Sequence, residues 1–273
     1  MISDYKQAVD NIRAHLKKYL VDNNLKSMVV GVSGGIDSAL TAALAYPVAK
    51  ELNIPLLTRS ITIETNKQDE IERSILVGEA FGDNFRHVDL TEAYRNLAPY
   101  IIEDFDKEEQ NSLDFKIRTG NIKARLRMLY LYDLAAKNKG LVLSTDNYTE
   151  LLLGFWTLHG DVGDLGMIQN LWKTEVYQMS KYLVENELND NQAKALQDCI
   201  DATPTDGLGI TNSDLEQLQA SSYSEVDNIL QSYVIRGENK YKDHPVVQRY
   251  HKSMYKRNNP YNFPREIITQ DKL

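Results

Sequence analysis

The feature of this 273-residue sequence that most restricts its fold is an apolar run that ends abruptly in a glycine turn. Residues 27–32 read SMVVGV, a β-branched run typical of a buried strand. Ser33-Gly34-Gly35 follows at once, and Asp37-Ser38 then opens an Ala- and Leu-rich segment that we expect to be helical to about Leu52. A strand, a glycine turn and a helix in this order indicate a βαβ unit and therefore a parallel sheet.

The same alternation extends over the first half of the chain. Further strands are expected at 54–63, 85–90 and 140–144, and further helices at 4–21, 67–81 and 121–137. After residue 174 the patterns are mainly helical, at 175–185, 190–199, 224–234 and 246–255, with a loop at 202–212. We predict an α/β fold class, a doubly wound and mostly parallel sheet with flanking helices. Residues 1–273 should form a single α/β domain, on which a helical C-terminal part of about 174–273 packs.

Polar residues follow two of the expected strands, at 33–38 and at 145–150. Parallel sheets bind ligands beyond the carboxyl ends of their strands, so both segments should face one crevice. Free backbone N–H groups at a helix start suit a phosphate or pyrophosphate there. Asp37 fits beside phosphates if a divalent cation such as Mg²⁺ is bound. Taken alone, however, residues 33–38 could also be a plain strand-to-helix turn with a capping Asp or Ser.

The charge of the chain argues against a broad nucleic-acid-binding face, because the formal net charge is −8. Two local basic clusters could each hold a phosphate or could simply be solvated: Arg125 with Arg127, and Lys252, Lys256 and Arg257. The apolar runs are too short to span a bilayer, and the N-terminal segment lacks the continuous apolar stretch of a signal peptide.

The single cysteine, Cys199, cannot form an internal disulfide, which fits a reducing cytoplasm. No partner motif surrounds it, so we expect a buried, inert thiol. Together these features indicate a cytoplasmic protein that binds neither membranes nor nucleic acids.

Residues 33–38 (SGGIDS) resemble the SGGxDS motif of the PP-loop family of ATP pyrophosphatases. Members of that family split ATP between its α- and β-phosphates, which implies that the SGG loop holds the departing pyrophosphate on a fold like that of the adenine nucleotide alpha hydrolases. The family includes synthetases of GMP, argininosuccinate, asparagine and NAD, and several tRNA-modifying enzymes. The resemblance therefore implies the reaction type more firmly than the substrate.

Further segments resemble the ammonia-dependent NAD synthetases, in the same order along the chain. They are residues 120–128 (GNIKARLRM), Thr145-Asp146 with Glu150 and Gly154-Phe155, Gly160-Asp161 with Asp164, Lys173, residues 204–208 (PTDGL) and Lys256-Arg257. This resemblance implies amidation of nicotinic acid adenine dinucleotide by ammonia, through an acyl-adenylate, with release of AMP and pyrophosphate. It also implies a homodimer, with the dinucleotide at the interface.

The resemblance implies roles residue by residue. Asp37 and Glu150 would ligate Mg²⁺, and Asp37 and Lys173 would be catalytic because the attack of a carboxylate on the α-phosphate brings two anions together. The positions that match ATP contacts are Ser33, Gly34, Gly35, Asp37, Ser38, Arg59, Thr145, Lys173 and Thr205. The positions that match contacts with the deamidated nucleotide are Arg125, Asp164, Tyr255 and Lys256.

The chain departs from the family pattern mainly on the acceptor side. Where many members read TDHAAE, residues 145–150 read TDNYTE, so that Asn147 replaces a histidine. Leu158 stands at the position of a lysine that touches the nucleotide substrate, and Tyr255 replaces the histidine of an HKR segment. The positions expected to bind the acceptor have thus lost basic groups, while those expected to bind ATP are intact. This puts the identity of the acceptor in doubt but not the chemistry.

Several functions stay open at this point. The acceptor could instead be nicotinic acid mononucleotide, since the sequence at Asn147 is faintly similar to that subgroup. A tRNA-modifying enzyme is disfavoured by the acidic charge. A non-catalytic ATP-binding relative is disfavoured because Asp37, Glu150 and Lys173 are all present. No glutaminase segment is evident, so free ammonia is the expected nitrogen source.

Overall fold

We describe the protein from a computed structural model, which covers residues 1–64, 66–103, 112–203 and 214–269. Thr205 and most of the loop predicted at 202–212 lie outside the described residues.

The centre of the molecule is a parallel sheet of five strands in the order β3-β2-β1-β4-β5. The strands are β1 (Met28–Gly31), β2 (Leu56–Thr62), β3 (Arg86–Asp89), β4 (Leu141–Ser144) and β5 (Leu165–Gly166). Central β1 pairs with β2 on one side and β4 on the other, with Met28 opposite both Leu56 and Leu141. The chain therefore changes direction across the sheet between β1 and β4, and at such a switch point the loops after both strands border one crevice.

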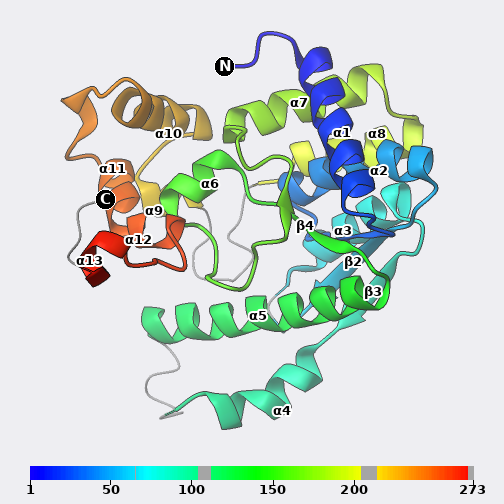
Figure 1. The fold of residues 1–273 in the computed structure, drawn as a ribbon, viewed down its shortest axis with the longest axis horizontal. Helices are drawn as coiled ribbons and strands as arrows, with labels where there is room; N and C mark the ends of the chain where they lie inside the picture. The colour runs from blue at the N-terminus through cyan, green and yellow to red at the C-terminus, as the bar shows by residue number, and fades with distance from the viewer. Residues whose placement is uncertain (65, 104–111, 204–213, 270–273) are drawn as a thin grey trace.

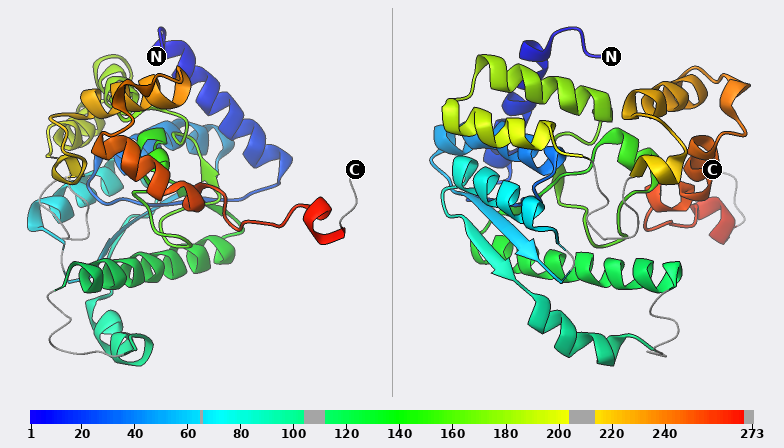
Figure 2. Two further views of the ribbon diagram at one scale, coloured as in Figure 1. Left: turned by 90° about the vertical axis from the view of Figure 1, so that its left-hand side faces the viewer. Right: turned by 180° about the vertical axis from the view of Figure 1, so that it is seen from behind.

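Helices cover both faces of the sheet (Figures 1 and 2). One face carries α1 (Tyr5–Asp22), α2 (Ile36–Leu52), α3 (Gln68–Phe81), α7 (Lys173–Asn186) and α8 (Asp190–Ile200). The main core lies under these helices and includes the fully buried Leu40, Leu44 and Phe81. On the other face α5 (Leu113–Lys137) packs against Val29 and Val142. The predicted doubly wound α/β fold is confirmed.

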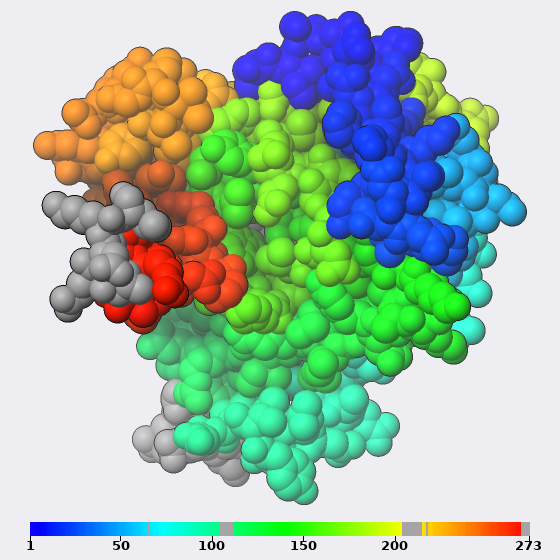
Figure 3. Space-filling model, in the orientation of Figure 1, coloured from blue at the N-terminus to red at the C-terminus, as the bar shows by residue number. Residues whose placement is uncertain are grey.

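The helices after residue 172 divide between two apolar clusters. α7 and α8 pack on α2 and α3 and belong to the main core. The second cluster joins α6 (Tyr148–Leu153) to the later helices α9 (Asp214–Leu218), α10 (Tyr223–Leu230) and α11 (Pro245–Lys252). α12 (Met254–Arg257) contacts α6 and α11. In Figure 3 the elements drawn in orange and red form a lobe at one side of the molecule. α13 (Arg265–Thr269) projects from it in Figure 2.

Several elements differ from the predictions in extent. The helix predicted from residue 121 starts at Leu113, where the Ser112 side chain accepts a hydrogen bond from the Phe115 N–H at 3.1 Å. α4 (Thr91–Ile101), which contains Pro99, and the two-residue β5 were not predicted. The helix predicted at 224–234 is α-helical to Leu230 and continues as a π-helical turn over Gln231–Ile235. In the part of the chain that the structure covers, no helix is long and apolar enough to cross a membrane.

Candidate active site

The loop between β1 and α2, residues 33–38, is closed by its own hydroxyl groups. The Ser33 N–H donates to the Ser38 hydroxyl at 3.1 Å, and that hydroxyl lies 3.0 Å from the Gly35 carbonyl oxygen. Gly35 is the N-cap of α2 and has no side chain to cap it, so the N–H groups of the first helical turn face the crevice. This phosphate loop (residues 33–38) combines free N–H groups with the positive end of a 17-residue helix, which favours an anion.

Gly34 lets α3 pack directly on this loop. Its φ is +83°, and a β-carbon added there would lie 2.3 Å from the Glu70 carbonyl oxygen. Arg73, also from α3, donates from Nε to the Gly34 carbonyl oxygen at 3.1 Å. A side chain at position 34 would thus strain the backbone and push α3 away.

A buried lysine joins the phosphate loop to the second polar segment. The Lys173 ammonium, at the start of α7, donates to Asp37 Oδ2 at 2.5 Å and to Glu150 Oε1 at 2.9 Å. Burial lowers the pKa of Lys173, but the charges of Asp37 and Glu150 outweigh it and hold the pKa well above its ordinary value. These three residues, 136 positions apart at the extremes, form the charged centre of the site.

Asn147 holds the two carboxylates in place. Its side-chain amide donates to Asp37 Oδ1 at 2.8 Å, and its side-chain oxygen accepts from the Glu150 N–H at 3.0 Å. It is the N-cap of α6 and forms a capping box with Glu150. The asparagine that departs from the family pattern therefore links Asp37 to Glu150.

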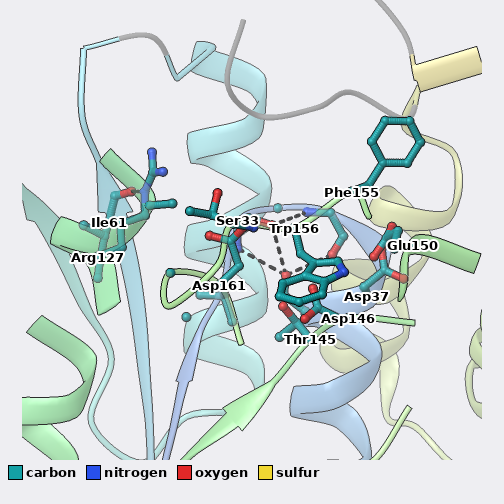
Figure 4. Close-up of a pocket in the computed structure, with 18 of the residues that line it drawn as sticks. Ser33, Asp37, Ile61, Arg127, Thr145, Asp146, Glu150, Phe155, Trp156 and Asp161 are labelled. Atoms are coloured by element: carbon teal, nitrogen blue, oxygen red, sulfur yellow. Dashed lines mark hydrogen bonds between the residues drawn. The ribbon is translucent and has the colours of Figure 1, made fainter. Parts of the chain in front are cut away.

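Two more carboxyl groups, those of Asp146 and Asp161, line the same space (Figure 4). Asp146 directly follows Thr145 after β4 and is 6% exposed. Burial, with the charges of Glu150, Asp161 and Asp37, raises the pKa of Asp146 well above its ordinary value. In Figure 4 Asp37, Asp146 and Glu150 lie on one side of the pocket, with the Trp156 indole beside them. This part of the pocket is acidic and suits a cation.

Two arginine side chains also line the pocket, and in Figure 4 Arg127 lies on the opposite side from Asp37 and Glu150. Arg59, in the middle of β2 and opposite Gly31 at the end of β1, is 3% exposed and donates to the Thr58 carbonyl oxygen at 2.7 Å and to the Asn84 carbonyl oxygen. Among the described residues, its Nε has no hydrogen-bond partner. Arg127 donates to the Ile61 carbonyl oxygen at 3.2 Å and to Asn66, and burial lowers its pKa. Both arginines line the cavity, which thus carries basic groups as well as carboxylates.

A cavity of about 470 Å³ unites these groups. Its wall includes the whole phosphate loop together with residues expected to contact ATP, namely Arg59, Thr145 and Lys173. A second cavity of about 490 Å³ shares Met128, Tyr132, Asp146, Trp156, Val162 and Lys256 with the first. The two cavities therefore adjoin at these six residues.

The carboxylates fit a magnesium ion that is shared with phosphate. Magnesium in nucleotide sites is usually held by one or two carboxylates and by phosphate oxygens. Asp37 and Glu150 supply two carboxylates beside the phosphate loop. Within the described residues no group of three or more His, Cys, Asp or Glu could hold a metal by itself. This donor set therefore suits Mg²⁺ bound together with ATP.

The sequence also matches the family model described as NAD synthase, over residues 8–260. The chain belongs to the NAD synthase family. A relative from Thermoplasma acidophilum named NH(3)-dependent NAD(+) synthetase is 31% identical over 265 residues, covering 95% of this chain and 98% of the relative. A relative of the same name from Finegoldia magna is 32% identical over 241 residues, covering 88% of this chain and 95% of the relative.

Two solved structures share the fold. NMN synthetase from Francisella tularensis superposes with a TM-score of 0.77 at 22% identity, covering 97% of this chain and 100% of that one. NH3-dependent NAD synthetase from Campylobacter jejuni gives 0.71 at 22% identity, covering 96% and 100%. At 22% identity these two structures support the architecture of this chain, and they do not indicate which acceptor it uses.

In this NAD synthase the residues expected to bind the acceptor are held differently from those expected to bind ATP. Arg125 is exposed and donates from Nε to the Leu158 carbonyl oxygen at 3.2 Å. Asp164 accepts from the Val142 N–H at 2.9 Å and from the Tyr132 hydroxyl at 3.0 Å. Tyr255 is 66% exposed. Arg125, Asp164 and Tyr255 are not among the described residues that line either cavity.

Lys256 is the acceptor candidate that reaches both cavities. Its ammonium donates to the Gly154 carbonyl oxygen at 2.7 Å and to the Trp156 carbonyl oxygen. Burial, followed by the positive charge of Arg249, lowers its pKa. Lys256 thus fixes the 154–156 turn, and the same ammonium lies beside the Trp156 ring, 5.3 Å from its centroid.

Several residues that line the first cavity had no assigned role from the sequence: Arg73, Asp146 and Asp161. Asn147 was noted as a departure from the family pattern and as a similarity to the mononucleotide subgroup. A local signal for its capping role existed, because an Asn three residues before a Glu is a capping-box pattern. Asp146 belongs to the segment 145–150 that was expected at this crevice, whereas Arg73 and Asp161 reach the cavity through tertiary packing, for which no local pattern exists.

Proposed function

We propose that this chain amidates the carboxylate of nicotinic acid adenine dinucleotide with ammonia, using ATP and Mg²⁺ and releasing AMP and pyrophosphate. The observation that carries the proposal is the Lys173 ammonium held between Asp37 and Glu150 beside the phosphate loop. Membership of the NAD synthase family supports the same reaction, as do the two curated relatives, which are named ammonia-dependent synthetases and are C–N ligases.

In the first step a carboxylate oxygen of the acceptor attacks the α-phosphorus of ATP. A C–O–P linkage forms, and the bond from that phosphorus to the bridging oxygen of pyrophosphate breaks. The N–H groups of the phosphate loop, with the Ser33 and Ser38 hydroxyls, would hold the leaving pyrophosphate. Lys173 would offset the charge that develops between two anions, because its ammonium is fixed and withdrawn from water.

Asp37 and Glu150 would hold Mg²⁺ together with the phosphate oxygens. When bound, the ion neutralises phosphate charge and makes the α-phosphorus a better electrophile. Lys173 contacts both carboxylates, so the lysine and the ion would be held by the same two side chains. ATP contacts are proposed for Ser33, Gly34, Gly35, Ser38, Arg59, Thr145 and Thr205 as well.

In the second step the nitrogen of ammonia attacks the carbonyl carbon, the C–N bond forms, and the C–O bond to AMP breaks. At neutral pH ammonia arrives mostly as ammonium and must lose a proton. The carboxyl groups of Asp146 and Asp161 line the cavity, and burial raises the pKa of both, which makes them better proton acceptors. They would take the proton that ammonium loses before the attack and the proton that the nitrogen loses after the C–N bond has formed. No side chain is needed as a nucleophile, because the adenylate forms on the substrate.

We also propose that the protein is a cytoplasmic homodimer that takes free ammonia. Support for self-association comes from apolar side chains that α4 and α5 leave exposed, with Tyr100 at 88%, Leu129 at 59% and Leu113 at 57%. Patches of this kind commonly mark protein contacts, and a twofold dimer is the commonest closed assembly. Analytical ultracentrifugation tests this part separately, since a monomer at micromolar concentration would contradict it.

A second acceptor, nicotinic acid mononucleotide, is favoured by one specific observation. Leu158 and Tyr255 stand where the family carries basic groups, and each lost charge-assisted hydrogen bond would weaken binding by about 1.5–3 kcal/mol. A mononucleotide has fewer contacts to lose. We favour the dinucleotide because the order and length of the matched segments follow the ammonia-dependent NAD synthetases.

The test is a single-buffer comparison of both acceptors. The protein is incubated with ATP, Mg²⁺, ammonium and each nicotinate nucleotide, and the products are identified by mass. We expect NAD, AMP and pyrophosphate in equal amounts from the dinucleotide. ADP and free phosphate as products would overturn the reaction type. A kcat/KM about tenfold or more in favour of the mononucleotide would change only the acceptor.

A further inference from the structure

A buried carboxylate outside the charged centre is bound to the first turn of α7. Asp227, in α10, is 2% exposed. Its Oδ2 accepts from the Thr174 N–H at 2.9 Å and from the Thr174 hydroxyl at 2.7 Å. Its Oδ1 accepts from the Thr149 hydroxyl at 2.6 Å. A carboxylate at a helix N-terminus satisfies N–H groups that lack an intrahelical partner and opposes the helix dipole favourably.

The hydrogen bonds continue to the backbone of Lys173. The Thr149 hydroxyl accepts from the Lys173 N–H at 2.9 Å while it donates to Asp227. Thr149 is 0% exposed and lies next to Glu150 in α6. A chain of hydrogen bonds therefore runs from Asp227 through Thr149 to the residue whose ammonium holds Asp37 and Glu150.

The same helix also lies against the other end of the lysine. The Lys173 ammonium is 5.3 Å from the centroid of the Tyr223 ring, at the start of α10. Tyr223 and Asp227 are four residues apart, so they lie on one face of that helix. Figures 1 and 2 show α10 beside the N-terminal end of α7, and the two helices are in contact.

We propose that Asp227, together with Tyr223, positions Lys173 for catalysis, so that α10 sets the geometry of the charged centre. This inference rests on the proposed function. Asp227 touches none of the reacting groups and acts through Thr149 and the first turn of α7. A displacement of the reacting groups by about 1 Å can slow an enzyme by about a hundredfold, so loss of this anchor should reduce kcat more than binding.

The test compares Asp227→Ala with two other variants in the full-length protein. Thr149→Val removes the hydroxyl that links Asp227 to Lys173 and keeps the side-chain shape. Val226→Ala is the matched control, because Val226 is 0% exposed in the same helix but packs only in the second apolar cluster. It should lower the melting temperature without altering the hydrogen bonds to α7.

Kinetics are the first measurement. We expect Asp227→Ala and Thr149→Val each to lower kcat by about tenfold or more, with the KM for ATP changed by no more than about threefold. Asp227→Asn should recover part of kcat, since its amide oxygen can still accept from Thr174. Val226→Ala should keep kcat near that of the wild type.

The second measurement does not depend on turnover. Buried lysines are acylated with acetic anhydride and the products are quantified by mass spectrometry, with Lys123 as internal reference. Lys123 is also buried, lies 3.1 Å from Glu64 Oε2 and faces the Tyr94 ring, but it is in α5. We expect acylation to rise at Lys173 and not at Lys123 in Asp227→Ala and Thr149→Val, and at neither lysine in Val226→Ala.

Equal kcat and equal labelling in Asp227→Ala and Val226→Ala would overturn the positioning role. If Asp227→Ala fails to fold, Thr149→Val decides by the same two criteria. A wild-type protein that forms no AMP with either nucleotide would refute the proposed function and with it the catalytic part of this inference. The labelling ratio would then still show whether Asp227 fixes Lys173.

Discussion

The charged centre beside the phosphate loop and the residues expected to bind the acceptor differ in how their side chains are held. In the charged centre, Lys173, Asp37, Glu150 and Asn147 bind one another, and their atoms come from three separate elements. A mutually bonded set is rigid before any ligand binds, which favours a fixed electrostatic task. Among the residues expected at the acceptor, Arg125 is exposed and donates to a backbone carbonyl oxygen, Asp164 accepts from Val142 and Tyr132, and Lys256 donates to two backbone carbonyl oxygens. These side chains are held singly by their surroundings, and it is among them that the sequence departs from its family.

The largest effect should come from the charged centre. Asp37→Asn keeps the shape of the side chain but removes a negative charge that pairs with Lys173 and that we propose to bind Mg²⁺. We expect kcat to fall by about a hundredfold or more, because a fixed charge in a buried site contributes strongly to the transition state. The melting temperature should fall only slightly, since Glu150 still pairs with Lys173.

Steady-state kinetics with calorimetry test this prediction. Asp10→Asn is the matched control, because Asp10 is an exposed carboxylate on α1 that pairs with Lys6. Near-normal turnover of Asp37→Asn at ordinary Mg²⁺ would remove Asp37 from the catalytic residues.

The next effect concerns the rigidity of the phosphate loop. Gly34→Ala places a β-carbon 2.3 Å from the Glu70 carbonyl oxygen at a φ of +83°. Backbone strain at such a position costs about 1–3 kcal/mol, and the contact with α3 adds to it. Gly35→Ala, whose β-carbon would lie 3.4 Å from the Ser33 hydroxyl oxygen, should cost much less stability. Denaturant unfolding of both variants measures this contrast, and equal losses would show that α3 does not restrain the loop.

A smaller and more selective effect should come from the residues expected to bind the acceptor. Arg125→Ala should leave the free energy of unfolding within about 0.5 kcal/mol, because the side chain is exposed. If Arg125 binds the nucleotide substrate, the KM for that substrate should rise by about tenfold while the KM for ATP stays constant. An unchanged KM for both substrates would exclude Arg125 from the acceptor site.

The smallest effect concerns Cys199, which lines the first cavity. Burial raises the pKa of this thiol to about 12, so the reactive thiolate is scarce at neutral pH. We expect iodoacetamide to label the native protein slowly at pH 8, to label it faster as the pH rises toward that pKa, and to react at once after unfolding. Rapid labelling of the native protein at pH 8 would mean that the cavity wall opens near Cys199.

The phosphate loop and its surroundings were largely predictable because their signals are local. A β-branched run, two glycines and a helix start identify β1, the loop and α2, and parallel pairing then brings the residues after β4 to the same edge. Lys173 was identified only through the family resemblance. Nothing near it in the sequence indicates that it meets Asp37, which lies 136 residues away.

The remaining features of the fold and the site depend on tertiary contacts, which no local sequence pattern indicates. α5 begins at Leu113 behind the Ser112 cap and includes Gly120, so the predicted start at residue 121 was wrong. β5 is two residues long and exists only because it pairs with β4. Asp227 is an ordinary helical residue in the sequence, and the positioning role proposed for it depends on how α10 packs against α7.

The central claim is that the acceptor carboxylate is adenylated, and oxygen transfer tests it most directly. Nicotinic acid adenine dinucleotide labelled with oxygen-18 in its carboxylate is converted with ATP, Mg²⁺ and ammonium, and the released nucleotides are analysed by mass spectrometry. We predict that AMP carries the label and that pyrophosphate does not. Label in inorganic phosphate together with ADP, or product NAD with unlabelled AMP, would contradict the account.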